Sequence, residues 1–308
     1  MRAFLTGATG FVGSHLCRLL VESGEEVAVL MRARSSPWRI EDLLDRVSVI
    51  RGDIVAIDSY KDELAAFKPD IVYHLGWHGV SNDSRNNAGQ VSENLSGGIA
   101  LAEMAASVGC SAVIGVGSQA EYGPCAGAMD ESAPTNPTTL YGAAKLSLYH
   151  LCRAALLESE VRFAWIRLFS AYGPMDNPNW MIPYLIDRLL DGKKPSLTLG
   201  EQKWDYIYVG DAVGAIASVG RTREAGGVFN LGSGKARPLR GVIESVRDLI
   251  DPTMPLGFGE VPYRPDQVMH LEADIRRLVG ATGWRPKTDI AEGLRKTIEW
   301  HREKRKPV

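Results

Sequence analysis

The chain has 308 residues, which is enough for one large or two small domains with a sizeable buried core. Its 35 Lys and Arg residues nearly balance its 37 Asp and Glu residues, so neither nucleic acid nor an anionic membrane surface is expected as a partner. Hydrophobic residues make up 45% of the chain and charged residues 23%, which excludes a disordered protein, a collagen and a coiled coil.

Strand-like and helix-like segments alternate through the first two thirds of the chain. Six apolar segments are predicted to be strands: residues 3–6, 26–31, 47–51, 71–75, 112–116 and 162–168. Helices are predicted between them: residues 13–23, 59–67, 91–108 and 141–158. This alternation predicts an α/β fold with a doubly wound parallel sheet, a Rossmann fold, covered by helices on both faces.

The last third of the chain differs because proline and glycine interrupt it repeatedly, which predicts a smaller, loop-rich C-terminal lobe. The cysteines are too scattered for a disulfide framework or a zinc site, so we expect reduced thiols and no metal: Cys17, Cys110, Cys125 and Cys152. The chain starts with a strand-like run instead of a signal peptide, and polar residues break its longest uncharged stretch. We therefore expect a cytoplasmic protein without a membrane span.

A glycine-rich segment, residues 6–13, joins the first predicted strand to the first predicted helix. Gly7 permits a tight turn, Gly10 lets the backbone approach a pyrophosphate, and Gly13 lets the helix pack closely on the strand. The N-terminus of the helix adds N–H donors and the positive end of its dipole. The position of the segment favours dinucleotide binding over a purely structural glycine turn.

Tyr141 and Lys145 are four residues apart at the start of a predicted helix, so their side chains share one face. A nearby ammonium stabilises a phenolate and lowers the pKa of tyrosine from about 10, which would let Tyr141 exchange protons near neutral pH. Ser118 follows the fifth predicted strand at its carboxyl end, where doubly wound sheets bind ligands. The alternatives are an exposed aromatic–lysine pair and a serine that caps a loop.

Together these residues resemble the extended short-chain dehydrogenase/reductase family, also called the NAD-dependent epimerase/dehydratase family, over nearly the whole chain. Further segments are similar to motifs of that family and follow in the same order: Gly52-Asp53, residues 74–77, Asn94, and residues 167–174, 204–211, 230–234 and 263–266. The resemblance implies that residues 1–170 form the dinucleotide-binding domain and that residues 171–308 mainly bind a nucleotide-sugar. A segment around residues 205–232 is expected to return to the first domain.

The resemblance also implies a set of site residues. Ser118, Tyr141 and Lys145 fall on the catalytic residues of the family. The implied cofactor-binding residues are Gly7, Thr9, Gly10, Phe11, Val12, Gly13, Arg32, Arg34, Asp53, Ile54, Leu75, Gly76, Tyr141, Lys145 and Phe169. The candidate substrate-binding residues are Trp77, His78, Gln119, Ser170, Trp180, Trp204 and Arg264. Ser170 replaces the usual Asn and Trp204 the usual Arg, so two family contacts to the nucleotide diphosphate are not carried over.

NADP(H) is the expected cofactor, with NAD as the alternative. Relatives specific for NAD place an Asp after the second strand to bond the ribose 2′-hydroxyl, and the aligned residue here is Met31. A 2′-phosphate would instead fit between Arg32 and Arg34 and receive charge-assisted hydrogen bonds. The plainer alternative is that both arginines are solvated in a loop.

The resemblance implies hydride transfer at C4 of a nucleotide-activated hexose. Tyr141 would exchange the proton of the C4 oxygen, Lys145 would lower the pKa of Tyr141 and hold the nicotinamide ribose, and Ser118 would polarise the oxygen. We expect an NADPH-dependent 4-ketoreductase of a CDP-, dTDP- or GDP-linked 4-keto-6-deoxyhexose, as in deoxysugar biosynthesis. The alternatives are an NAD-dependent nucleotide-sugar 4-epimerase and, from another class, a non-catalytic NAD(P)-sensing regulator.

Two further expectations concern the dehydratases of the family and the assembly. The 4,6-dehydratases carry an Asp-Glu pair directly after the catalytic Ser or Thr, whereas this chain has Gln119 and Ala120, so dehydration is not expected.

A homodimer is expected to form through a four-helix bundle of the predicted helices 91–108 and 141–158, because the first is rich in small and apolar residues.

Overall fold

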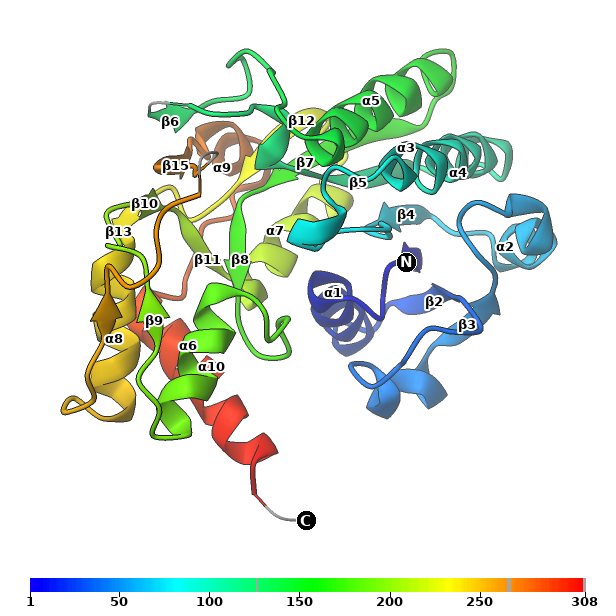
Figure 1. Cartoon of the computed structure of the whole chain (residues 1–308). Helices are drawn as coiled ribbons and strands as arrows, with labels where there is room; N and C mark the ends of the chain where they lie inside the picture. The colour runs from blue at the N-terminus through cyan, green and yellow to red at the C-terminus, as the bar shows by residue number, and fades with distance from the viewer. Residues whose placement is uncertain (126, 265–266, 307–308) are drawn as a thin grey trace.

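Seven parallel strands form the central sheet in a computed structural model that describes residues 1–125, 127–264 and 267–306 (Figure 1). The strands are β1 (Arg2–Thr6), β2 (Glu26–Met31), β3 (Ser48–Arg51), β4 (Ile71–His74), β5 (Ala112–Ser118), β7 (Arg162–Leu168) and β12 (Gly227–Leu231). Their order across the sheet is β12-β7-β5-β4-β1-β2-β3, and every neighbouring pair is parallel. The predicted α/β fold with a doubly wound sheet is confirmed.

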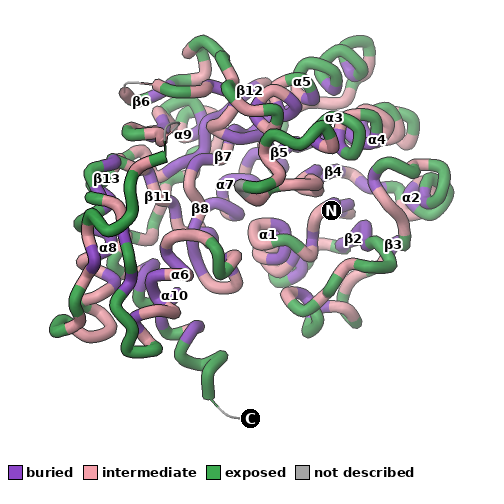
Figure 2. Tube along the Cα trace, viewed as in Figure 1, coloured by how far each residue is buried: buried purple, intermediate pink, exposed green. Residues whose placement is uncertain are grey.

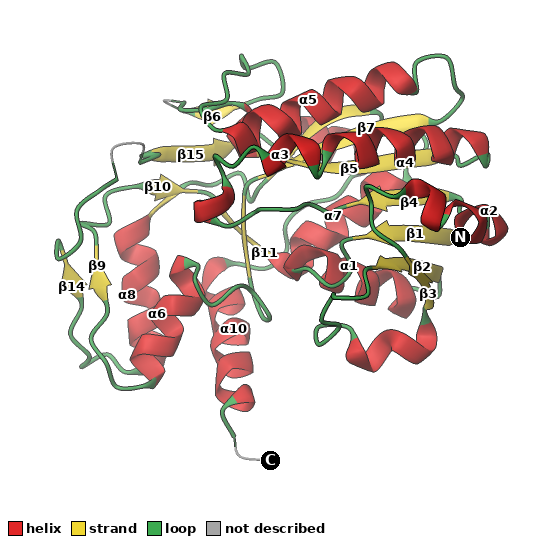
Figure 3. Cartoon of the chain, turned by 45° about the vertical axis from the view of Figure 1, so that its right-hand side comes forward, coloured by secondary structure: helices red, strands yellow, loops and turns green. Residues whose placement is uncertain are grey.

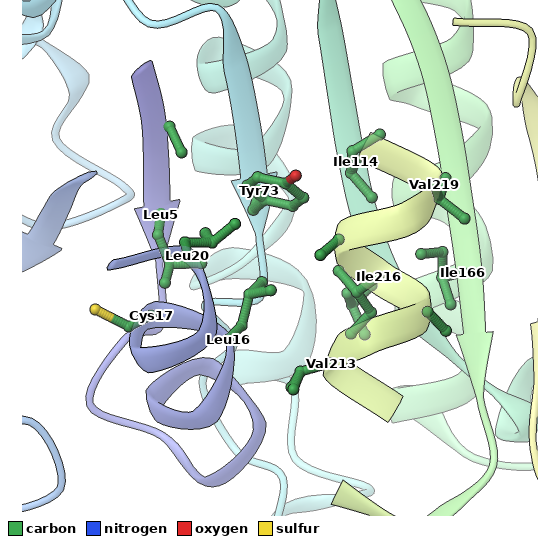
Figure 4. Close-up of a cluster of buried hydrophobic side chains, with 14 of the residues drawn as sticks. Leu5, Leu16, Cys17, Leu20, Tyr73, Ile114, Ile166, Val213, Ile216 and Val219 are labelled. Carbon is green, nitrogen blue, oxygen red and sulfur yellow. The ribbon is translucent and has the colours of Figure 1, made fainter. Parts of the chain in front are cut away.

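Helices cover both faces of this sheet because the strands are apolar on both sides (Figure 3). One face carries α1 (Phe11–Glu22) and α7 (Val209–Arg221), and the other carries α2 (Lys61–Phe67), α4 (Leu95–Ser107) and α5 (Leu140–Ala155). Figure 4 shows Leu16 and Leu20 of α1 and Ile216 of α7 in the apolar cluster against the strands. Each such buried side chain contributes about 1.5–3 kcal/mol of transfer free energy.

The carboxyl ends of three strands define where a ligand can bind. β1 pairs with β2 on one side and with β4 on the other. The chain runs from β1 outward to β2 and β3 and then crosses back to β4, so the strand order reverses between β1 and β4. A crevice forms outside the carboxyl ends of the strands at such a switch point. Thr6 ends β1, His74 ends β4 and Ser118 ends β5. Thr6 and Ser118 line the crevice, whereas His74 is buried and its Nδ1 lies 2.8 Å from the hydroxyl of Thr6.

The C-terminal lobe packs three helices around its own apolar cluster. They are α6 (Met181–Leu190), α8 (Leu239–Ile250) and α10 (Ile290–Lys304). A mixed sheet of four short strands contains β6 (Ala128–Met129), β10 (Lys203–Trp204), β13 (Arg237–Pro238) and β15 (His270–Ala273). Two further pairs are β8 (Ser170–Tyr172) with β11 (Tyr206–Tyr208) and β9 (Ser196–Leu197) with β14 (Gly257–Phe258). Figure 2 shows that burial is concentrated in the central sheet and that exposed residues lie on outer helices such as α2 and α8.

Some late segments pack with the central sheet. α7 belongs to the apolar cluster of the sheet, β12 pairs with β7, and α9 (Arg276–Thr282) packs beside both α7 and β12. A domain boundary after residue 170 stays a prediction. In the described part of the chain no helix is both long and apolar enough to cross a membrane.

An aromatic contact joins the segment after β2 to the C-terminal helix. The ring of Trp38 stacks on that of Trp300 in α10 with 6.5 Å between centroids, and the ammonium of Lys304 lies 4.9 Å from the Trp38 centroid. The 3₁₀ helix η1 (Glu41–Arg46) follows in the same segment. The remaining short helices are η2 (Ile57–Ser59), η3 (Asn82–Ser84), α3 (Gly89–Ser92) and η4 (Gln119–Glu121).

The predicted continuous helix over residues 91–108 is wrong, because the structure divides it into α3 and α4. Asn94 lies between them with φ −127° and ψ −42°, outside the helical conformation. Its amide oxygen accepts from the N–H of His78 at 2.7 Å, and its amide nitrogen donates to the carbonyl of Gln90 at 3.0 Å. Asn94 therefore leaves the helix to hold the segment that follows β4.

Candidate active site

A continuous cavity of about 920 Å³ extends from the glycine-rich turn into the C-terminal lobe. Every residue of the predicted catalytic, cofactor-binding and substrate-binding sets lines it except Arg34, whose side chain is exposed. The expected phosphate site between Arg32 and Arg34 stays a prediction, because Arg34 belongs to the same exposed segment as Arg32 but does not line the cavity. Arg32 remains at the cavity, joined there by Ser35 and Arg39 of the same segment.

The glycine-rich turn fits a pyrophosphate. Gly7 has φ +79°, and a Cβ there would lie 2.6 Å from the backbone nitrogen of Gly76. A Cβ on Gly13 would lie 2.1 Å from the carbonyl oxygen of Gly7, so only glycine permits this approach of helix and strand. Because α1 begins at Phe11, its first N–H groups face the cavity without intrahelical acceptors.

Charged side chains cluster at the end of the cavity beyond this turn. A guanidinium nitrogen of Arg32 lies 2.9 Å from Nε2 of His78, and the same His78 nitrogen lies 3.8 Å from a carboxylate oxygen of Asp53. Glu93 reaches the other ring nitrogen of His78 at 3.3 Å. His78 was predicted in the substrate set, whereas the structure places it among the predicted cofactor residues.

Arg39 is a cavity residue that the motifs did not mark. Its guanidinium donates to the carbonyl of Thr9 at 3.2 Å and to the carbonyl of Met175 at 2.9 Å. It thus bridges the glycine-rich turn and the substrate lobe. Its place in the same basic segment as Arg32 was a signal, but only the fold shows which arginines of the segment face inward.

The three predicted catalytic residues meet at the carboxyl edge of β5. Ser118 is the last residue of that strand, and Tyr141 and Lys145 lie in the first turns of α5. The Ser118 side chain lies beside the phenol of Tyr141, close enough to lower its pKa. The Lys145 ammonium donates to the carbonyl of Val116 at 2.7 Å and lies 3.8 Å from the ring centroid of Trp77.

The expectation that Lys145 lowers the pKa of Tyr141 is corrected. Burial raises the pKa of Tyr141, opposed by the Ser118 side chain and by the positive charge of Arg85. Burial lowers the pKa of Lys145 to about 7, opposed by the negative charge of Glu121. The physical reason is that the ammonium is directed at Val116 and Trp77, in surroundings that disfavour its charge.

A buried network of hydrogen bonds around Glu121 fixes the backbone of Ser118. Glu121 is fully buried, and its carboxylate accepts from the backbone N–H of Ser118 at 2.8 Å, from Nε1 of Trp165 at 2.9 Å and from Nε of Arg167 at 2.8 Å. The Ser118 hydroxyl in turn accepts from the N–H of Ala120 at 3.2 Å. Sequence reasoning missed Glu121, although the Ser-x-x-Glu spacing of a capping box was a signal.

The substrate wall of the cavity comes mainly from the C-terminal lobe. Ser170, Trp180, Trp204 and Arg264 line it, and Nε1 of Trp204 donates to the carbonyl of Val268 at 3.0 Å. Pro265 and Asp266, the end of the last predicted motif, lie outside the described residues.

Comparison with known proteins agrees with this geometry. The model of the NAD dependent epimerase/dehydratase family matches residues 3–232. The chain belongs to this family. A UDP-glucose 4-epimerase of Mycolicibacterium smegmatis is 28% identical, with 99% of each chain covered. A dTDP-glucose 4,6-dehydratase of Neisseria meningitidis is 26% identical, with 97% of this chain and 93% of that protein covered.

Solved structures of the family have the same fold. The UDP-glucose 4-epimerase of Thermus thermophilus in complex with NAD superposes with a TM-score of 0.84 at 25% identity, covering 98% of this chain and 99% of that chain. The chain is therefore an enzyme of an NAD-dependent family, which sets aside the non-catalytic regulator. The relatives named here are epimerases and a dehydratase, not ketoreductases, so they favour the alternative prediction over the main one.

Proposed function

We propose that the chain is a nucleotide-sugar 4-epimerase. The observation that carries the proposal is the Ser118–Tyr141–Lys145 cluster, which faces the same cavity as the dinucleotide turn. Among the relatives, the Mycolicibacterium smegmatis and Thermus thermophilus proteins are both UDP-glucose 4-epimerases. Bound NAD would be held by the glycine-rich turn, Asp53, Tyr141 and Lys145, and it supplies a hydride acceptor and donor.

Tyr141 would move one proton from the C4 oxygen of the sugar and then back to it. Tyr141 takes the proton of the C4 hydroxyl as hydride leaves C4, and returns that proton after hydride is added to the opposite face. The Ser118 hydroxyl donates a hydrogen bond to the C4 oxygen, whose negative charge grows during the transfer. Lys145 binds the cofactor ribose and places a positive charge beside it.

Dehydration is not expected from this site. Gln119 lines the cavity at the first position of the dehydratase acid pair, and Ala120 occupies the second. The neighbouring carboxylate of Glu121 is fully buried and bonded to Trp165 and Arg167, so it does not replace the missing pair. A 4-keto-6-deoxy product from a parent nucleotide-hexose would overturn this proposal.

A second candidate is the 4-ketoreductase with NADP(H), and one observation favours it. No acid stands at the end of β2, where Met31 is buried, and Arg32, Ser35 and Arg39 line the cavity instead. A 2′-phosphate would receive charge-assisted hydrogen bonds there. A reductase must release its oxidised cofactor in each cycle, whereas an epimerase keeps NAD bound.

One experiment separates the two candidates. Purified protein is incubated with UDP-, dTDP-, CDP- and GDP-hexoses without added cofactor, and the products are identified by NMR. Conversion between C4 epimers without net oxidation is expected and supports the epimerase. A stoichiometric loss of absorbance at 340 nm with NADPH and a 4-keto-6-deoxyhexose, and no epimerisation, would establish the reductase instead.

A homodimer and a cytoplasmic location complete the proposal. α4 and α5 pack side by side on one face of the sheet, and Leu151 of α5 is 39% exposed. A second copy placed on these helices would form the four-helix bundle. Light scattering at micromolar concentration should give twice the mass of the chain, and a monomer mass would contradict this arrangement.

A further inference from the structure

An arginine that no motif marked lies over the ring of Tyr141. The guanidinium carbon of Arg85 is 5.6 Å from the centroid of that ring, and its side chain lines the cavity together with Ser118 and Tyr141. Arg85 follows η3 in the segment between β4 and α3. The fold therefore adds a second cation to a site in which the motifs indicated Lys145 alone.

Backbone contacts hold Arg85 in this position. The N–H of Tyr141 donates to the carbonyl of Arg85 at 2.8 Å, and the N–H of Leu140 donates to the side chain of Asn86 at 3.1 Å. Both N–H groups belong to the first turn of α5, where the helix offers them no acceptor. Gln90 fixes the other side of the segment by donating to the carbonyl of Ser84 at 2.9 Å.

Arg85 is half-buried and makes no ion pair with a carboxylate within the described residues. Its Nε is buried and makes no hydrogen bond in that part of the chain. A buried N–H donor such as this Nε costs free energy when it makes no hydrogen bond. A role for this cation must therefore come from what it does to its neighbours.

Some charged groups around Tyr141 shift the pKa of its phenol, and other titratable groups nearby do not. The positive charge of Arg85 lowers the pKa of the phenol, while the negative charge of Glu121, on the far side of Ser118, raises it. The Lys145 ammonium bonds Val116 and faces Trp77, and His74 on the neighbouring strand is buried with its pKa lowered to about 3, so it is uncharged at neutral pH. Arg85 is thus the cation that favours the phenolate.

We propose that Arg85 is a positioning residue for proton transfer, holding Tyr141 and stabilising its phenolate through the ring face. The proposal rests on the proposed function, in which the phenolate of Tyr141 takes the proton of the C4 hydroxyl and Tyr141 later returns that proton. A phenolate ring is richer in electrons than a phenol ring, so the cation over its face binds the charged form more strongly. In the first step the tyrosine oxygen supplies the electron pair of its new O–H bond, and the electron pair of the C4 O–H bond becomes part of the C4 carbonyl as hydride leaves.

The test removes the charge and measures the ionisation of Tyr141 directly. The variants are Arg85→Met, Arg85→Lys and the matched control Arg153→Met, which changes an exposed residue of α5 outside the cavity. The ionisation of Tyr141 in each is followed by ultraviolet difference absorbance, with the same protein carrying Tyr141→Phe as the reference. Arg85→Met should raise the Tyr141 pKa by about one unit, whereas the lysine and control variants should stay near the wild type. Equal pKa values in all four proteins would overturn the proposal.

Kinetics provide the second readout. Arg85→Met should lower kcat near pH 7 about tenfold and move the pH profile of kcat to higher pH, with the KM for cofactor unchanged. Arg85→Gln replaces Arg85→Met if the latter does not fold. If Arg85→Met is fully active while Tyr141→Phe is inactive, the role of Arg85 is contradicted and the proposed epimerase function is not. If no nucleotide-sugar reacts, the titration still decides the role of Arg85.

Discussion

The two walls of the cavity are built in different ways. On the wall formed by the central sheet, Ser118 is tied through its backbone to Glu121, which is tied to Trp165 and Arg167. On the wall formed by the C-terminal lobe, apolar side chains of α6 and α8 surround a few polar groups. Hydrogen bonds within the protein fix the side chains of the first wall. On the second wall, a few side chains determine which substrate is bound. Catalytic geometry is therefore expected to tolerate less change than substrate preference.

The largest expected effect comes from the reacting group of the first wall. Tyr141→Phe removes the proton donor and should lower kcat by about two to four orders of magnitude. The ring remains, so its edge-to-face contact with Trp77 and the affinity for cofactor should be nearly unchanged. Steady-state kinetics and cofactor titration check both parts, and a variant that loses both equally would contradict the assigned role.

Glu121→Ala tests whether the buried hydrogen bonds of Glu121 stabilise the first wall. Removing the carboxylate leaves Arg167 buried without its anion, so the free energy of unfolding should fall by about 3–5 kcal/mol. Denaturant unfolding measures this change. Glu103→Ala, at an exposed position of α4, is the matched control and should change stability little. Similar losses in the two variants would show that the network does not hold this wall.

Arg32→Ala tests the cofactor end of the cavity. If a 2′-phosphate binds there, the loss of charge-assisted hydrogen bonds should weaken NADPH about tenfold or more and leave NADH nearly unaffected. Arg34→Ala should have a much smaller effect, because its side chain does not line the cavity. Isothermal titration measures the affinities of the wild type and both variants for NADPH and for NADH, and an unchanged preference in Arg32→Ala would favour NAD as the cofactor.

Asp176 on the second wall should make stability depend on pH. Burial raises its pKa from 3.8 to about 7, opposed by the N–H of Asn177 and the charge of Arg39. Between these values the folded chain keeps a proton that the unfolded chain releases, so stability falls as the pH rises from about 4 to 7. Asp176→Asn should be about 1–3 kcal/mol more stable than the wild type at pH 8, and about equal at pH 4. Unfolding curves at both pH values decide this, and a difference that does not depend on pH would contradict it.

The features predicted correctly from sequence depend on neighbours along the chain. The alternation of strands and helices comes from local periodicity, and the glycine-rich turn needs only Gly7, Gly10 and Gly13 at fixed spacing. Ser118, Tyr141 and Lys145 were placed together through the family resemblance, and the fold brings the ends of β5 and α5 together.

The features that sequence reasoning missed depend on distant residues. Arg39 faces inward because Thr9 and Met175 accept its hydrogen bonds, and periodicity carries no signal for such contacts. The break in the helix at Asn94 depends likewise on His78. The pKa of Tyr141 was mispredicted because spacing along a helix does not reveal how deeply a phenol is buried.

The contact between Trp38 and Trp300 has a consequence for how the cofactor end of the cavity can open. Trp38 and Arg39 lie in the segment that borders the cofactor end of the cavity, and Arg39 binds the glycine-rich turn. Moving this segment aside separates the two indoles and breaks both hydrogen bonds of Arg39, at a cost on the order of 3 kcal/mol. Any motion that opens the cavity on this side therefore has to separate Trp38 from Trp300 of the C-terminal helix.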